Sequence, residues 1–194
     1  APGERVEVLV RGDRPGGLYR LLNLPYNRGG MGMMGSTGGR SGPAQALATV
    51  VYEGFAGSSL DLPGVLIPLD PLPETRLPVR RFVLSSGGVP GRGMSFLING
   101  RTFDHRRVDT QVRLDTIEDW EILNADTMDH PFHLHTNSFQ ILAGANQPAR
   151  AWKDVVLVPA GQQRRLRVRF AHYAGKTVYH CHIMDHEDLG MMGV

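Results

Sequence analysis

The stretch "VYHCHIMDHEDLGMM", residues 178–192, contains three histidines, the chain's only cysteine and three methionines. Side chains alternate along a strand, so His180 and His182 should share one face, with Cα atoms roughly 7 Å apart, while Cys181 faces the other way. His186 and Met191 follow, joined by an expected loop that contains Gly190. Cysteine, histidine and a weak methionine ligand, completed by one more histidine, form the ligand set of a blue-copper electron-transfer site. The pattern therefore predicts one strand that serves two metal sites.

A second histidine-rich segment, "DHPFHLH" at residues 129–135, offers the missing ligand. His133 and His135 repeat the two-residue spacing, and His130 precedes them, turned out of register by Pro131 in our interpretation. Zinc is the chemical alternative, but its structural sites close with four ligands and rarely use methionine. The two segments hold too many ligands for one ion. The remaining histidines, His105 and His172, fit neither pattern and are expected to be structural or surface residues.

The composition describes a globular chain with few further clues. It has 194 residues, 41% of them hydrophobic, and a formal net charge of +2. Acidic and basic residues are interspersed, so no basic stripe for nucleic acid is expected. A single cysteine excludes an internal disulfide. No apolar run approaches the roughly 20 residues of a membrane span, and the first residues do not resemble a signal peptide, so neither feature is expected in these 194 residues.

Strand signals dominate the second half of the sequence. Short apolar or alternating segments separated by Gly, Asn, Asp or Pro occupy residues 80–86, 94–100, 110–116, 119–126, 137–143, 153–160, 163–170 and 176–182. Their regular spacing, without a segment of helical period, predicts an all-β fold, a Greek-key β-sandwich.

The first 80 residues predict a different organisation. "APGERVEVLVRGD" at residues 1–13 alternates Val6, Val8 and Val10 on one face, and "ALATVVYEG" at residues 46–54 gives a second strand. We expect residues 1–55 to be the end of a preceding domain already under way at residue 1. Five prolines make residues 56–80 a linker in our interpretation. Residues 81–194 then form the metal-binding domain.

A glycine-rich segment, "NRGGMGMMGSTGGRSG" at residues 27–42, carries Met31, Met33 and Met34. One interpretation is a flexible hairpin tip whose methionines touch a neighbour. The other is a contact with a soft metal or a substrate, because thioethers suit Cu(I).

"HPFHLH" and "HCHIMDHEDLGM" resemble the two C-terminal copper signatures of the multicopper oxidases, the family of laccases, spore-coat and copper-efflux oxidases, and ferroxidases. "PGERVEVLV" and "LATVVYEG" are similar to late strands of the family's second cupredoxin domain, and "FLINGRTFD" and "WKDVVLVPAG" to its third. The resemblance implies the C-terminal part of a three-domain oxidase, located in the periplasm or outside the cell as most relatives are.

The resemblance also implies a role for each ligand. The type 1 copper ligands would be His130, Cys181, His186 and Met191; His133 would bind type 2 copper; and His135, His180 and His182 would bind type 3 copper. A reductant would give single electrons through the solvent-facing edge of His186. They would pass through Cys181 to a trinuclear cluster that reduces O₂ to water. Glu187 occupies the position where spore-coat laccases carry a proton-delivering acid, although a solvated acid is the alternative.

The sequence departs from the family pattern in one respect. A complete trinuclear cluster takes eight histidines, four of them from the N-terminal domain, and no His-x-His occurs here before residue 133. The chain would thus offer a whole type 1 site and half a cluster. It could be part of a longer or cleaved oxidase, which we favour, a homo-oligomer that pairs half-sites, or a blue-copper electron-transfer module. Copper storage or sensing through the methionine-rich loop is a further alternative. Phenols, aromatic amines, Cu(I), Fe(II) and Mn(II) are all candidate reductants, and the loop slightly favours Cu(I).

Overall fold

The computed structural model describes residues 1–10, 13–27, 29, 43–54, 61, 64, 69–73, 77–142 and 151–194. The chain divides into two compact units, one of Ala1–Glu4 with Leu69–Val194 and one of Arg5–Pro68. Met31, Met33 and Met34 lie outside the described residues, so the prediction for their loop stays open. Part of the expected linker, residues 69–73, belongs to the larger unit.

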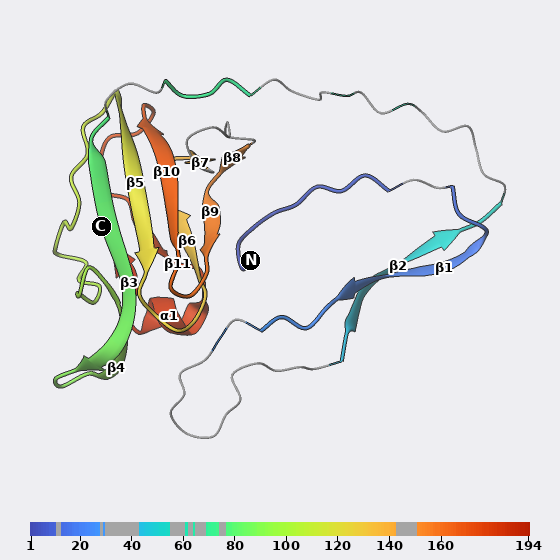
Figure 1. Ribbon diagram of the computed structural model, residues 1–194, viewed down its shortest axis with the longest axis horizontal. Coiled ribbons are helices and arrows are strands. Elements are labelled where there is room, and N and C mark those ends of the chain that lie inside the picture. The colour runs from blue at the N-terminus through green and yellow to red at the C-terminus, as the bar shows by residue number, and fades with distance from the viewer. Residues whose placement is uncertain are drawn as a thin grey trace. The chain divides into compact units, whose positions relative to one another are not determined.

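The larger unit is nearly all β, which confirms the predicted fold class (Figure 1). Its elements are β3 (Val79–Val89), β4 (Gly93–Ile98), β5 (Thr116–Asn124), β6 (His130–Leu134), β7 (Phe139–Leu142), β8 (Trp152–Lys153), β9 (Val155–Val158), β10 (Gln163–Phe170), β11 (Tyr179–Cys181), α1 (Met184–Asp188) and β12 (Met192–Gly193).

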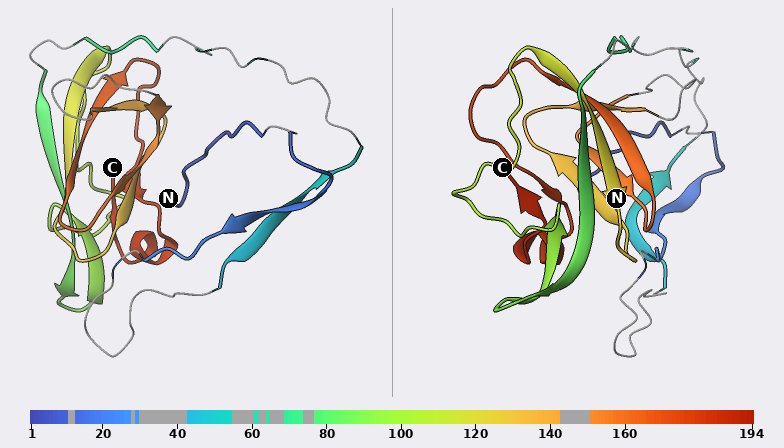
Figure 2. Two further views of the ribbon diagram at one scale, coloured as in Figure 1. Left: turned by 45° about the vertical axis from the view of Figure 1, so that its right-hand side comes forward. Right: turned by 60° about the vertical axis from the view of Figure 1, so that its left-hand side comes forward.

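These strands form two sheets that face each other across an aromatic core. One sheet has the order β4-β3-β5-β10-β7-β8, and the other has the order β12-β11-β6-β9. Between β5 and β11 the chain crosses repeatedly from one sheet to the other, as a Greek-key sandwich requires (Figure 2). Ring centroids of Phe82 and Phe132 lie 6.2 Å apart, and those of Trp120 and Tyr179 lie 5.8 Å apart, so each pair joins the two sheets. This buried apolar area stabilises the sandwich.

The outer face of the six-stranded sheet carries a buried ion pair. Arg167 on β10 donates two hydrogen bonds, of 2.8 and 3.0 Å, to the carboxylate of Asp119 on β5. Gln140 on β7 accepts the Leu72 N–H at 2.9 Å and donates to the Asp70 carbonyl at 2.9 Å. These contacts hold residues 70–72 against the outer face of the sheet. This part of the expected linker is therefore packed on the domain and does not form a free connection.

Strands β6 and β11 place the predicted ligands. They pair antiparallel, with His180 opposite His133 and Cys181 opposite Phe132. His130 lies within β6 itself, three residues from His133, so the two side chains face opposite sides by ordinary strand alternation. The expectation that Pro131 turns His130 out of register is therefore wrong. Pro131 remains in the strand, opposite Leu157 of β9.

Two predicted features of this unit are not observed. Residues 110–115 form no strand, because their backbone finds other partners: the Thr110 N–H donates to the Val194 carbonyl at 3.0 Å, and the Gln111 carbonyl accepts a bond of 2.6 Å from Arg80. The segment that carries His186 toward Met191, expected to be a loop, begins inside a short helix, α1. A helix of five residues is too short to show a helical period in the sequence.

The smaller unit contains an antiparallel hairpin of β1 (Gly17–Asn23) and β2 (Gln45–Tyr52). The second strand was predicted and is confirmed. Residues 6–10 are not a strand, and Val6, Val8 and Val10 are exposed. An alternating segment becomes a strand only when a neighbour satisfies its backbone groups, and none of the described residues pairs with it.

Candidate metal centre

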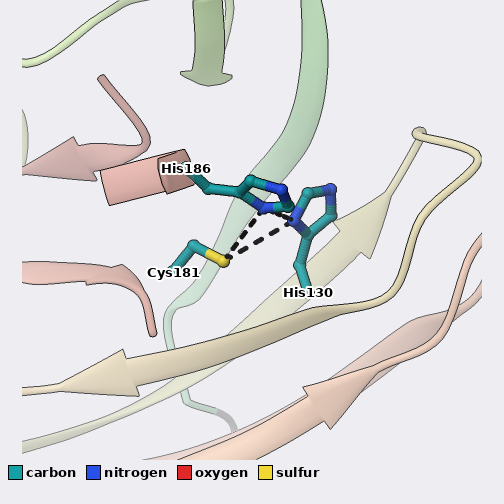
Figure 3. Close-up of side chains that lie close together, drawn as sticks. All are labelled: His130, Cys181 and His186. Carbon is teal, nitrogen blue, oxygen red and sulfur yellow. Dashed lines mark hydrogen bonds between the residues drawn. The ribbon is translucent and has the colours of Figure 1, made fainter. Parts of the chain in front are cut away.

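The side chains of one cysteine and two histidines, Cys181, His130 and His186, point toward one another (Figure 3). The Cys181 sulfur lies 3.6 Å from Nδ1 of His130 and 3.6 Å from Nδ1 of His186, and the two nitrogens are 3.0 Å apart. Cys181 and His130 are fully buried, and His186 is 4% exposed. The three donor atoms converge closely enough to bind one ion.

His130 comes from β6, Cys181 from β11 and His186 from α1. Backbone hydrogen bonds hold a fourth residue, Met191, next to them in the fold. The Cys181 N–H donates to the Met191 carbonyl at 3.0 Å, and the Met191 N–H donates to the His186 carbonyl at 2.9 Å. The Met191 side chain is fully buried. Gly190 adopts φ +113°, a conformation that favours glycine, where the chain returns from α1. The fold thus brings all four predicted type 1 residues to one place.

Burial and a neighbouring carboxylate determine the charge and the position of the ring proton of His130. Burial lowers the pKa of His130, which keeps the imidazole neutral, as a metal ligand must be. Asp126 Oδ2 lies 3.2 Å from Nε2 of His130. Because this carboxylate accepts the Nε2 proton, the Nδ1 lone pair is left to point toward Cys181.

Asp126 was not predicted from the sequence. Burial alone would raise its pKa, but hydrogen bonds from Ser86, Thr127 and His130 lower the pKa below its usual value. The sequence signal that was available is an acid four residues before the first histidine of "HPFHLH", at a turn where many acids serve only as caps.

The donor set of this cluster fits copper. Two imidazole nitrogens, one thiolate and a buried methionine are the ligands of a trigonal blue-copper site with a weak axial thioether. Tetrahedral structural zinc would more commonly use additional cysteine or histidine. The residues that would hold the ion are His130, Cys181, His186 and Met191.

The second cluster lies on the opposite face of β6 and β11 and contains histidines alone. His133, His135 and His180 bring their ring nitrogens together closely enough to bind an ion. The Nε2 atoms of His135 and His180 are 2.9 Å apart. The ring of His182 lies 5.4 Å from that of His133, between centroids. The structure therefore gathers the four histidines of the predicted half-cluster.

Hydrogen bonds orient these rings. Nδ1 of His133 donates to the Asp154 carbonyl at 2.8 Å, which leaves its Nε2 available to a metal. Nδ1 of His180 lies 2.9 Å from the Cys181 carbonyl and 3.1 Å from Glu187 Oε2. Burial lowers the pKa of His133 and His135, and for His133 the hydrogen bond to the Asp154 carbonyl offsets part of this lowering. These imidazoles are therefore held neutral.

The remaining histidines and the aspartates near the two clusters are not part of either cluster. His105 and His172 are exposed and belong to neither cluster. Asp129 accepts the Ala160 N–H at 2.8 Å, and Asp185 and Asp188 are exposed on or beside the turn of α1. Among the described residues, no helix is long and apolar enough to cross a membrane.

Residues 75–194 match the family model of the multicopper oxidases. This chain belongs to the multicopper oxidase family. It is 40% identical over 111 residues to the multicopper oxidase mco of Staphylococcus haemolyticus, covering 53% of this chain and 25% of that protein. It is 33% identical over 124 residues to a laccase of Bacillus subtilis, covering 53% of this chain and 24% of the laccase.

A solved structure extends the likeness beyond the matched segment. The multicopper oxidase of Campylobacter jejuni, described as a metallo-oxidase, aligns with a TM-score of 0.72 and 30% identity over 93% of this chain and 40% of that one. The cupredoxin fold class is therefore confirmed, and the chain is a member of an oxidoreductase family that uses copper. It spans about a quarter of the length of these two curated relatives.

Proposed function

We propose that this chain is the C-terminal part of a laccase-like multicopper oxidase. In its complete form the protein would oxidise its substrate one electron at a time at the Cys181 cluster and reduce O₂ to water at the histidine cluster. One observation carries the proposal: Cys181 and His180 are neighbours on β11, yet each belongs to a different cluster on opposite faces of the sheet. A site that only transferred electrons to a partner would leave the second cluster without purpose.

The chain's own residues provide the binding and the electron path. Bound copper would supply one-electron redox chemistry at the first cluster and O₂ chemistry at the second. His130 and Cys181 hold their donors in a buried environment, and His186 reaches the same point from α1. From Cys181 the covalent chain leads to His180 on one side and to His182 on the other. The hydrogen bond between the Cys181 carbonyl and Nδ1 of His180, at 2.9 Å, offers a second and shorter route.

Glu187 is proposed to assist proton delivery. Its carboxylate contacts Nδ1 of His180 at 3.1 Å, and its side chain is 33% exposed. The residue thus links solvent to a ring of the histidine cluster, where the reduction of each O₂ to water consumes four protons. A carboxylate in such a position can accept protons from water and release them inward.

The remaining histidines of the cluster are proposed to come from N-terminal domains of the same oxidase. The chain supplies four histidines on one face, and this family's trinuclear cluster takes eight. Two copies that pair their half-sites would be the alternative source, and an electron-transfer module would need no source at all. We propose a periplasmic or extracellular location, as in most members of the family.

The reductant is proposed to be a phenolic or aromatic compound, with Cu(I) as a second substrate. The observation that favours Cu(I) is the sequence of Met31, Met33 and Met34, because thioethers bind this ion well. Replacing all three with leucine keeps apolar bulk and removes every sulfur. We expect a raised KM for Cu(I) with little change for a phenolic dye. Equal effects on both substrates would contradict a sulfur-specific role.

Copper content and oxygen uptake test the function directly. The complete protein, meaning this chain with its N-terminal domains, should bind four coppers and consume one O₂ for every four electrons taken from a phenolic dye. Hydrogen peroxide as the product, or a single copper in an inactive complete protein, would favour the electron-transfer alternative.

A further inference from the structure

We infer that Phe96 is the positioning residue for the His186 imidazole. The two rings are stacked, with centroids 3.9 Å apart and planes inclined by 19°. Phe96 comes from β4 and His186 from α1, ninety residues later in the chain, so the contact is tertiary. The inference rests on the proposed copper site and identifies a residue outside the ligand set that shapes it.

Strand β4 also fixes the backbone that carries His186. The Phe96 N–H donates to the Leu189 carbonyl at 3.1 Å, and the Phe103 N–H donates to the Gly190 carbonyl at 3.0 Å. A Cβ at Gly190 would lie 3.1 Å from the Phe96 carbonyl oxygen and 2.9 Å from the Thr102 side chain. The segment between α1 and Met191 is therefore packed closely against β4 and the residues that follow it, and the stacked ring belongs to a rigid support.

The stack controls the rotation that matters for the ligand. Rotation about χ2 of histidine is broad, so a free imidazole can swing its Nδ1 away from a target. The Phe96 ring, with its centroid 3.9 Å away and its plane inclined by only 19°, leaves little room for this rotation. With the ring held, Nδ1 of His186 points at the Cys181 sulfur, 3.6 Å away. Phe96 thus does for His186 what the Asp126 carboxylate does for His130.

The same stack restricts how a reductant can approach. Phe96 is 5% exposed and His186 is 4% exposed, so one face of the imidazole is covered by protein. An aromatic donor cannot stack on that face. It must approach the ring from another side, because Phe96 shields this face from solvent.

The test compares Phe96→Leu with Phe139→Leu in the copper-loaded complete protein. Both changes remove a buried ring and retain an apolar side chain, but Phe139 is on β7 and does not take part in either cluster. We expect Phe96→Leu to lose Cu(I) to a competing chelator with an affinity about tenfold lower than wild type, because residues that orient a ligand typically contribute about this factor to metal affinity. Its thiolate absorption and its copper EPR signal should also shift. Phe139→Leu should lower thermal stability and leave all three readouts unchanged.

A second pair of variants at Phe96 tests the same role without depending on whether Phe96→Leu folds. Phe96→Tyr retains an aromatic face and Phe96→Ile does not, so the isoleucine variant should bind Cu(I) more weakly than the tyrosine variant. If Phe96→Leu and Phe139→Leu behave alike in a blue protein, the positioning role is wrong while the proposed function stands. A wild-type protein without thiolate–copper absorption would overturn both.

Discussion

Cys181 is the residue at which the two clusters meet, so its sulfur should be indispensable. Replacing it with serine in the complete protein should abolish both the blue colour and oxidase activity, because a hydroxyl cannot replace the soft, covalent copper–thiolate bond. Visible absorption and oxygen uptake measure the two effects. Retained turnover of a phenolic dye by Cys181→Ser would show that electrons enter elsewhere.

Met191 tests the axial position of the same site. Its side chain is fully buried and its backbone is hydrogen bonded to those of Cys181 and His186, so Met191→Leu should keep the fold and the copper. The reduction potential should rise, because removal of a weak donor disfavours Cu(II). Redox titration measures the change. An unchanged potential would move the axial role to Met192 or show that the site has no axial donor.

Asp126 tests the orientation of the other histidine. Asp126→Ala removes the acceptor of the His130 Nε2 proton and with it the preference for a free Nδ1. We expect copper affinity to fall by about tenfold. Competition with a chelator of known affinity measures it, with Asp129→Ala as the matched control because that carboxylate binds the Ala160 N–H instead. Equal affinities in the two variants would contradict the orienting role.

At the scale of elements, alternation predicted the strands that carry the ligands, because "HPFHLH" and "VYHCH" each place unlike side chains on two faces. The same alternation predicted strands at residues 6–10 and 110–115 that the structure does not form. Strand pairing there depends on partners distant in the sequence, which a local pattern does not reveal. Helix α1 was not predicted, because its five residues make little more than one turn and show no helical period. Asp126 and Phe96 were missed for a related reason: their roles arise from contacts with His130 and His186 that only the fold creates.

The buried ion pair on the outer sheet makes a prediction about stability. Arg167→Met would leave the Asp119 carboxylate, whose side chain is 2% exposed, paired with the more exposed Arg165 instead of the buried Arg167. Loss of a buried partner should lower the free energy of unfolding by about 3 kcal/mol. Arg81→Met is the matched control: it breaks an ion pair with Glu121 in which the arginine is 81% exposed, and should cost less than about 1 kcal/mol. Urea unfolding curves measure both. Similar losses would show that the Arg167 pair does not stabilise the sheet.

At the scale of the whole molecule, the proposal makes the chain the carrier of one complete metal site and one partial site. All four residues of the first site lie in the unit that contains Leu69–Val194, on elements that the sandwich holds together. The histidine cluster, by contrast, would need further histidines from the rest of the oxidase to form the proposed trinuclear site. The first site should therefore form in this chain alone, whereas oxygen reduction should require the rest of the oxidase.

A copper titration of the 194-residue chain, followed by visible absorption, tests this account most directly. We predict an intense thiolate-to-copper band that rises linearly and stops at one copper per chain, with no such band in Cys181→Ser. Copper added beyond one equivalent should bind weakly at the histidine face without adding to the band. A chain that binds copper with no thiolate absorption, or that keeps the band in Cys181→Ser, would contradict the claim that His130, Cys181, His186 and Met191 form a blue-copper site.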